Sequence, residues 1–204
     1  MFGNIDALTL IVLIVSILIS LSVHEFMHAL VGYKLGDTTA EQDGRLSLNP
    51  LRHIDPFMTV ILPIITLVFI GAPVLAAKPV PFNPNFVKFE EYGGALIAIA
   101  GPLSNLAMAV ISALVASLLM DGSLPEQILN IFTGLNVAIF VFNLIPIPPL
   151  DGSRVLYAFA PGPVQQFMEQ IEPYGFFIII FLVFIGGFGG VITHLNDAIL
   201  NFLP

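Results

Sequence analysis

Five long apolar segments constrain this chain more than any other feature of its sequence. They extend over Ala7–Val31, Phe57–Ala77, Ala95–Leu119, Ile128–Leu144 and Tyr174–Ile192. About 20 mainly apolar residues are enough for a helix to cross a bilayer. Only 10% of the 204 residues are charged, whereas about 25% are charged in a typical soluble protein. The sequence therefore predicts an all-α polytopic membrane protein with one integral membrane domain over residues 1–204.

The charge balance and the lack of cysteine exclude several classes of protein. Fourteen acidic and six basic residues give a net charge of −8, and no basic run could neutralise a phosphate backbone, so a nucleic-acid partner is not expected. Because the chain has no cysteine, disulfides, thiolate metal sites and cysteine nucleophiles are excluded. The first apolar segment has no basic residue before it and no small-residue cleavage site after it, so we interpret it as a permanent helix.

The second apolar segment, Phe57–Ala77, is interpreted as re-entrant. It contains Pro63, Gly71 and Pro73, which interrupt helical hydrogen bonding. If the segment crossed, the six Lys and Arg residues would be divided equally between the two faces of the membrane. If it enters and leaves on one face, all six lie together on that face, as the positive-inside rule favours. We therefore predict four crossing helices plus one re-entrant segment, in the cell membrane, with the basic face toward the cytoplasm.

Two further features complete the predicted architecture. The polar stretch Gly32–Pro56 contains turn residues followed by alternating apolar and polar residues, and this pattern predicts a small interfacial β-hairpin. The fifth apolar segment is interpreted as a crossing helix that a glycine-rich run, Gly186–Gly190, interrupts.

The residues suited to chemistry begin with His24-Glu25-Phe26-Met27-His28 in the first apolar segment. Residues four apart share a helix face, so both imidazoles can bind one zinc ion, while Glu25 can reach a water molecule at that ion. Two histidines and a glutamate are costly to bury in a membrane unless they have a partner. The motif therefore predicts a metal site.

A catalytic zinc site has three protein ligands and one open position, so a third ligand is required. The candidates are His53, Asp55, Asp151 and His194. Asp151 follows prolines that must unwind the end of the fourth apolar segment. If Phe57–Ala77 is re-entrant, the first and fourth segments run parallel and bring Asp151 to the depth of the two histidines. We therefore favour Asp151, although it could instead only cap the next helix.

The sequence HEFMH followed by FNLIPIPPLDG resembles the site-2 protease family of intramembrane zinc metalloproteases. The motifs AGPLSN at Ala100–Asn105 and GRLSLNP at Gly44–Pro50 support the resemblance, which covers Ser22 to Tyr157 and is greatest for minimal members without PDZ or CBS domains. One departure is the inserted segment Phe57–Ala77.

The resemblance assigns a role to each residue of the site. It implies one Zn²⁺ per chain with His24, His28 and Asp151 as ligands. It also implies that Glu25 is the catalytic glutamate and that Asn143 helps to hold the scissile carbonyl.

The sequence thus predicts an intramembrane zinc endopeptidase whose partners are transmembrane protein or peptide substrates and the lipid bilayer. Glu25 would accept a proton from water and return it to the leaving amine, and Asn143 would donate a hydrogen bond to the developing oxyanion. An alternative is a zinc transporter or sensor that uses the same ligands. Glu25 argues against that alternative because a transporter needs no general base. A zinc hydrolase of lipid-like substrates also stays open.

Overall fold

The computed structural model describes residues 6–53, 81, 83, 86–184 and 188–204. Its elements, in chain order, are α1 (Ala7–Lys34), α2 (Thr39–Gln42), the 3₁₀ turn η1 (Pro50–Arg52), α4 (Glu90–Ala116), α5 (Leu124–Asn143), α6 (Asp151–Phe159), α7 (Gly162–Ile171), the 3₁₀ turn η4 (Glu172–Tyr174), α8 (Gly175–Phe184) and α9 (Phe188–Leu200). Within these described residues, three helices are long and apolar enough to cross a membrane, namely α1, α4 and α5.

Local sequence sets the ends of these three helices. The side chain of Asp6 caps α1 by accepting a hydrogen bond of 2.7 Å from the backbone N–H of Thr9. Gly122, with a φ of 75°, forms the turn after α4, and Pro125 lies in the first turn of α5, where a proline is tolerated. The helices match the first, third and fourth apolar segments, and the prediction of a mainly helical fold with helices suited to a membrane is confirmed for the described part of the chain.

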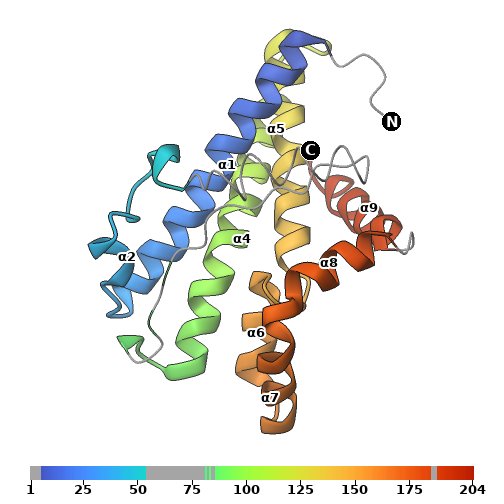
Figure 1. The fold of residues 1–204 in the computed structure, drawn as a ribbon. Helices are drawn as coiled ribbons and strands as arrows, with labels where there is room; N and C mark the ends of the chain where they lie inside the picture. The colour runs from blue at the N-terminus through green and yellow to red at the C-terminus, as the bar shows by residue number, and fades with distance from the viewer. Residues whose placement is uncertain (1–5, 54–80, 82, 84–85, 185–187) are drawn as a thin grey trace.

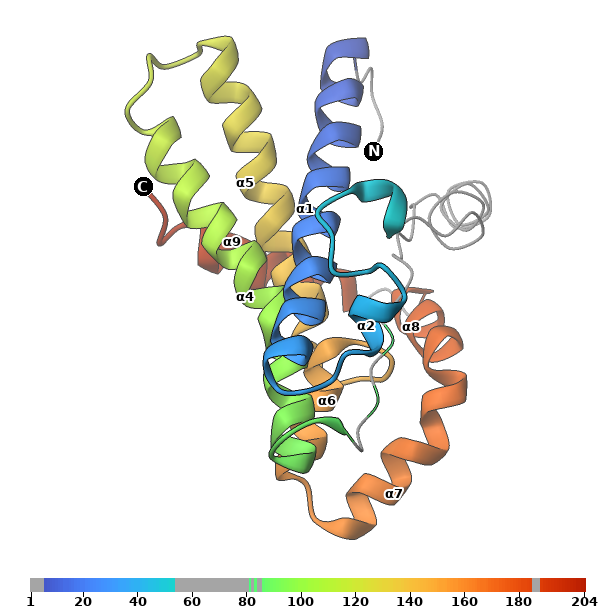
Figure 2. The same ribbon diagram turned by 90° about the vertical axis from the view of Figure 1, so that its left-hand side faces the viewer.

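Helix α4 lies at the centre of the molecule and packs against α1, α5 and α6 (Figures 1 and 2). It runs antiparallel to both α1 and α5, so α1 and α5 run parallel, as the sequence predicted. The start of α1 and the α4–α5 turn lie at one end of the bundle, which we call the outer end. The end of α1, the start of α4 and both α6 and α7 lie at the other end, which we call the inner end.

The two flanks of Phe57–Ala77 meet at the inner end. The carboxylate of Asp37, which is 2% exposed, accepts a hydrogen bond of 2.7 Å from the backbone N–H of Asn83. The backbone N–H of Lys88 donates to the carbonyl oxygen of Leu35 at 3.0 Å. The chain therefore starts α4 at the end of the bundle where α1 finishes. Phe57–Ala77 itself lies outside the described residues, and its re-entrant path stays a prediction.

The β-hairpin predicted over Gly32–Pro56 is wrong for residues 32–53, the part of it that the structure describes. That stretch contains α2 and η1 and no strand. The side chain of Asn49 caps η1, and the Nε2 atom of His53 forms a hydrogen bond of 2.7 Å with the carbonyl oxygen of Ser47. These local hydrogen bonds from side chain to backbone take the place of a ladder between strands.

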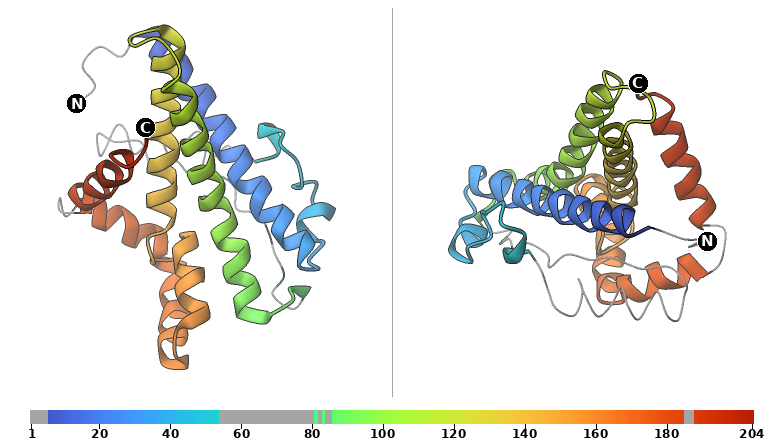
Figure 3. Two further views of the ribbon diagram at one scale, coloured as in Figure 1. Left: turned by 180° about the vertical axis from the view of Figure 1, so that it is seen from behind. Right: turned by 90° about the horizontal axis from the view of Figure 1, so that it is seen from above.

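The prediction of one crossing helix over Tyr174–Ile192 is not confirmed by the described residues. The segment is divided between α8 and α9, of 10 and 13 residues, on either side of residues 185–187, which lie outside the described residues. The two helices point in different directions (Figures 1 and 3), and neither is among the described helices that are long and apolar enough to cross a membrane. The glycines near this point weaken a helix by about 1 kcal/mol each relative to alanine.

Helix α9 packs beside α5 instead of continuing the direction of α8 (Figure 3). Its apolar residues Ile192, Ile199 and Leu200 pack against a cluster formed by Ala109, Val137 and Val141. Among the described residues three helices are thus long and apolar enough to cross a membrane, and the fourth predicted crossing is not confirmed.

Candidate metal centre

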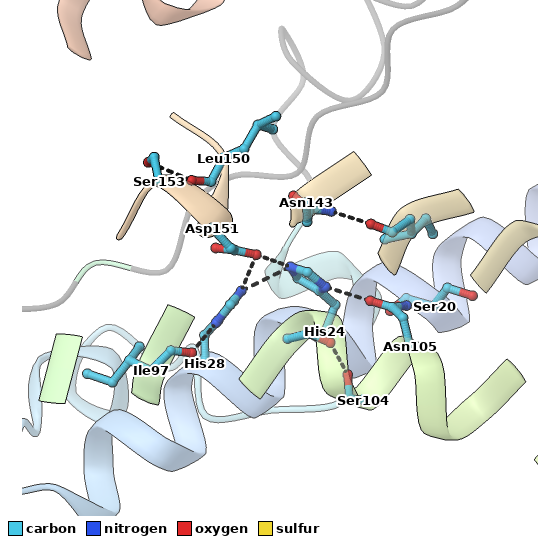
Figure 4. Close-up of polar contacts among 12 residues, drawn as sticks. Ser20, His24, His28, Ile97, Ser104, Asn105, Asn143, Leu150, Asp151 and Ser153 are labelled. Atoms are coloured by element: carbon cyan, nitrogen blue, oxygen red, sulfur yellow. Dashed lines mark hydrogen bonds and ion pairs between the residues drawn. The ribbon is translucent and has the colours of Figure 1, made fainter. Parts of the chain in front are cut away.

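His24, His28 and Asp151 meet in the inner part of the bundle (Figure 4). The Oδ2 atom of Asp151 lies 3.1 Å from Nε2 of His24 and 3.3 Å from Nε2 of His28, and the two Nε2 atoms are 2.9 Å apart. Helix α1 supplies both histidines, and the first residue of α6 supplies the aspartate. The structure therefore brings together the three residues that the sequence predicted as metal ligands.

Hydrogen bonds on the far side of each imidazole determine which nitrogen is free. Nδ1 of His24 lies 2.6 Å from the side-chain oxygen of Asn105, and Nδ1 of His28 lies 2.7 Å from the backbone oxygen of Ile97. These oxygens can only accept hydrogen bonds, so both Nδ1 atoms carry a hydrogen and donate it. Both Nε2 atoms are therefore left with a lone pair that points toward Asp151.

These three ligand atoms fit a zinc ion. Oδ2 of Asp151 is buried and receives no hydrogen bond, so it faces two imidazole nitrogens that are acceptors as well. Three acceptors in contact repel one another unless a cation lies between them. Ligand atoms at about 2.0–2.1 Å from a tetrahedral zinc are about 3.3 Å apart, close to the distances between these atoms.

The proline-rich turn after α5 places Asp151 at the centre. A Cβ atom at Gly152 would lie 2.2 Å from the carbonyl oxygen of Leu144 and 2.7 Å from that of Ile145, so only glycine permits this close turn. The hydroxyl of Ser153 donates a hydrogen bond of 2.7 Å to the carbonyl oxygen of Leu150 (Figure 4). Gly152 and Ser153 thus stabilise the backbone conformation that places Asp151 at the centre.

Gly101 of α4 leaves the space that the histidine pair occupies. A Cβ atom at this position would lie 2.4 Å from Nε2 of His28 and 2.7 Å from Nε2 of His24. The sequence identifies this glycine only as part of the AGPLSN motif, and its contact with the imidazoles comes from the structure.

Asn105 is a second residue whose contact with the site the sequence did not predict. It is 0% exposed, and its side chain touches His24 (Figure 4). An asparagine inside an apolar helix is the signal that could have found it, because such a residue needs a hydrogen-bond partner in the bundle.

The two predicted catalytic residues come from α1 and from the end of α5. Glu25 follows His24 on α1 and is 7% exposed. Asn143 is the last residue of α5, and its side-chain N–H donates a hydrogen bond of 3.0 Å to the carbonyl oxygen of Ile139 in the same helix (Figure 4). Their catalytic roles stay predictions.

The other histidine and carboxylate candidates are not part of the group. His53 is buried and bonds to the loop that contains Ser47, and His194 is exposed on α9. Asp55 lies outside the described residues.

Comparison of the sequence with known proteins finds several relatives. No family model and no solved structure matches the chain. The protein YwhC of Bacillus subtilis is 36% identical over 187 residues, which are 86% of this chain and 82% of YwhC. MJ0611 of Methanocaldococcus jannaschii is 32% identical over 157 residues, 76% of this chain and 74% of MJ0611. Rip2 of Mycolicibacterium smegmatis is 30% identical over 175 residues, 85% of this chain and 66% of Rip2.

All three relatives carry names that describe them as candidate zinc metalloproteases. Three helices suited to a membrane and a group of two histidines and one aspartate fit a membrane zinc protease. The match to YwhC extends over most of both proteins, and the chain therefore belongs to the zinc metalloprotease family that contains YwhC.

Proposed function

We propose that this protein is an intramembrane zinc endopeptidase of the site-2 protease type, which hydrolyses peptide bonds in or near transmembrane segments of other membrane proteins in regulated intramembrane proteolysis. The observation that carries the proposal is the meeting of two imidazole nitrogens and one buried carboxylate oxygen in a bundle of helices that can cross a membrane. His24, His28 and Asp151 would hold one Zn²⁺ per chain.

In this proposal Glu25 is the base and Asn143 is the hydrogen-bond donor. A bound zinc ion would polarise the peptide carbonyl and make water more acidic. Glu25, which is outside the ligand group, accepts a proton from the attacking water and passes it to the leaving amine. Asn143 uses one N–H on the carbonyl oxygen of Ile139, and because a side-chain amide has two N–H groups, the second can donate to the substrate oxygen.

The inner end of the bundle is the end that we propose faces the cytoplasm, in the cell membrane. Helix α1 ends at Lys34, Lys88 comes two residues before α4, and Arg154 lies in α6, whereas the α4–α5 turn at the outer end has no basic residue. Cytoplasmic loops carry an excess of Lys and Arg.

Single cysteines can test this orientation, because the chain has none of its own. Asp43→Cys lies on the inner side and Asp121→Cys in the outer turn, and both positions are exposed. An impermeant thiol reagent added to intact cells should label Asp121→Cys alone. Labelling of Asp43→Cys alone would reverse the orientation.

The activity itself is tested by incubating the purified protein with a panel of transmembrane peptides and reading the products by mass spectrometry. We expect cleavage that a zinc chelator abolishes and added zinc restores. Zinc uptake into proteoliposomes without any peptide cleavage would instead favour a transporter. Cleavage of lipid-like esters alone would favour a hydrolase with the same metal site.

A further inference from the structure

A pair of buried amides connects α5 to the metal centre. Asn105 on α4 and Asn136 on α5 are both 0% exposed. The side-chain nitrogen of Asn105 donates to the side-chain oxygen of Asn136 at 2.8 Å, and the side-chain oxygen of Asn105 lies 2.6 Å from Nδ1 of His24. The side-chain nitrogen of Asn136 donates to the carbonyl oxygen of Phe132 at 2.9 Å. The contacts thus form one continuous line from α5 through α4 to α1.

Each contact in this line fixes the direction of the next. The carbonyl of Phe132 can only accept a hydrogen bond, so the amide of Asn136 must turn its NH₂ group toward it and its oxygen toward α4. That oxygen in turn requires the NH₂ group of Asn105, whose oxygen must then face His24. Because an amide oxygen only accepts, His24 must carry its hydrogen on Nδ1, which leaves Nε2 bare.

The carbonyl oxygen of Ser20 makes a weaker contact that favours the same orientation of the Asn105 amide. It lies 3.5 Å from the side-chain nitrogen of Asn105, at the limit of a hydrogen bond. Since it too is only an acceptor, it also favours the orientation in which the oxygen of Asn105 faces His24 (Figure 4).

We propose that Asn105 and Asn136 are positioning residues that hold His24 in its Nδ1–H tautomer and so make Nε2 available to the metal. The inference rests on the proposed zinc site. It adds that the amide pair keeps Nε2 of His24 free of hydrogen and therefore able to bind the metal. The partner of His28 is the backbone oxygen of Ile97, which is an acceptor whatever the side chain. Only His24 depends on an arrangement of side chains that substitution can change.

Two substitutions at Asn105 separate a positioning role from a packing role. Asn105→Asp keeps an oxygen that accepts from His24, although it cannot donate to Asn136. Asn105→Leu has a similar size and suits an apolar helix, but it removes the acceptor. A positioning role predicts that zinc affinity falls about 10- to 100-fold in the Leu variant and that the Asp variant binds zinc on the order of tenfold more tightly than the Leu variant. A packing role predicts the reverse order, since a buried charge disturbs an apolar helix more than leucine does.

The measurements are zinc affinity, by competition with a chelating dye, and the ¹⁵N spectrum of labelled histidine in the metal-free protein. We expect the His24 ring to be protonated at Nδ1 in the wild type and to populate both tautomers in Asn105→Leu. Asn136→Leu should lower zinc affinity less than Asn105→Leu, because Asn105 then keeps its oxygen but loses its main orienting partner.

The matched control is a polar pair between the same two helices that does not reach a histidine. The hydroxyls of Ser112 and Thr133 lie 2.7 Å apart and are buried, and Ser112→Ala should leave zinc affinity and the histidine spectrum unchanged. The thermal unfolding temperature of each metal-free variant shows whether the bundle is intact.

The outcomes distinguish this inference from the proposed function. If the wild type binds zinc and both Asn105 variants bind it equally well, the positioning role is wrong and the protease proposal stands. If Asn105→Leu binds zinc more tightly than Asn105→Asp, the amide acts only in packing. If the wild type binds no zinc, both the positioning role and the proposed function are wrong.

Discussion

The two halves of α1 differ in the kind of side chain that they bury in the bundle. In the outer half, residues 7–20, the residues buried against the bundle are Val12, Ser16 and Ser20, and about half of the surface of several large aliphatic side chains is exposed, namely Leu8, Leu10, Ile11, Ile14, Val15 and Ile19. In the inner half, residues 21–34, the buried positions include the two histidines and Glu25. The first half of α1 therefore exposes many of its aliphatic side chains on the surface of the bundle, whereas the second half buries ionisable side chains inside it.

This difference shows what a bundle in a membrane can and cannot use for packing. Lipid is as apolar as leucine, so large aliphatic residues gain little by facing another helix, and small residues that let helices approach closely are preferred there. Ionisable groups are tolerated only where the bundle supplies partners for them. In this protein those partners are Asp151, Asn105 and the backbone of Ile97.

The largest effect should come from removing the aspartate that faces the inner half of α1. Asp151→Ala leaves two imidazoles without their third partner, and a catalytic zinc site needs three protein ligands. We expect both zinc content, measured by atomic emission on the purified protein, and cleavage of transmembrane peptides to be lost. Full zinc occupancy in this variant would show that another residue is the third ligand.

Glu25→Gln should separate catalysis from metal binding within the inner half. Because the glutamate is the proposed proton acceptor and not a ligand, we expect zinc content to be unchanged and the rate of peptide cleavage to fall by about 10²- to 10⁴-fold. Glu41→Gln, on the exposed surface of α2, is the control and should cleave at the wild-type rate. A cleavage rate near wild type in Glu25→Gln would contradict the protease mechanism.

Gly101→Ala tests the space between α4 and the inner half of α1. The added methyl would lie within 3.0 Å of both imidazoles, so the histidines must move and zinc affinity should fall on the order of 10- to 100-fold. Gly134→Ala on α5 is the matched control, because no atom lies within 4 Å of its added methyl. Equal zinc affinity in the two variants would mean that the histidines do not need this space.

The smallest effect is expected in the outer half. Ser16→Leu places a large side chain at a position that is 4% exposed, and overpacking of this kind costs about 1–3 kcal/mol. Ile14→Leu, at a position that is 50% exposed, should leave the thermal unfolding temperature in detergent unchanged. Zinc affinity should be the same in both variants, and a loss in either would show that the two halves of α1 are coupled.

The sequence was sufficient to predict the long helices and the parallel course of α1 and α5. Apolar length alone identifies a helix that can cross a membrane, because an isolated span must satisfy its own backbone hydrogen bonds. Placing Asp151 near His24 and His28 required only that the helices carrying them run in the same direction, and the structure brings these three residues together.

The sequence was not sufficient where local hydrogen bonds compete with a regular pattern. Alternating apolar and polar residues predicted a hairpin after α1, but Asn49 and His53 bind nearby backbone atoms instead. The apolar run from Tyr174 predicted a fourth crossing helix, yet α8 and α9 point in different directions (Figure 1). Neither outcome follows from hydropathy, which measures how apolar a segment is and not which atoms its polar groups bind.

The sequence by itself determined which residues could bind a metal, because the spacing of His24 and His28 places them on one face of any α-helix. Only the tertiary structure decided how the imidazole rings of these histidines are oriented and which nitrogen of each ring is free. Gly101 and Asn105 come from a different helix, and their distances to the imidazoles depend on how closely α4 approaches α1. A ligand's identity is a property of the chain, whereas the free nitrogen that it offers depends on the hydrogen bond made by its other nitrogen, which only the packed bundle supplies.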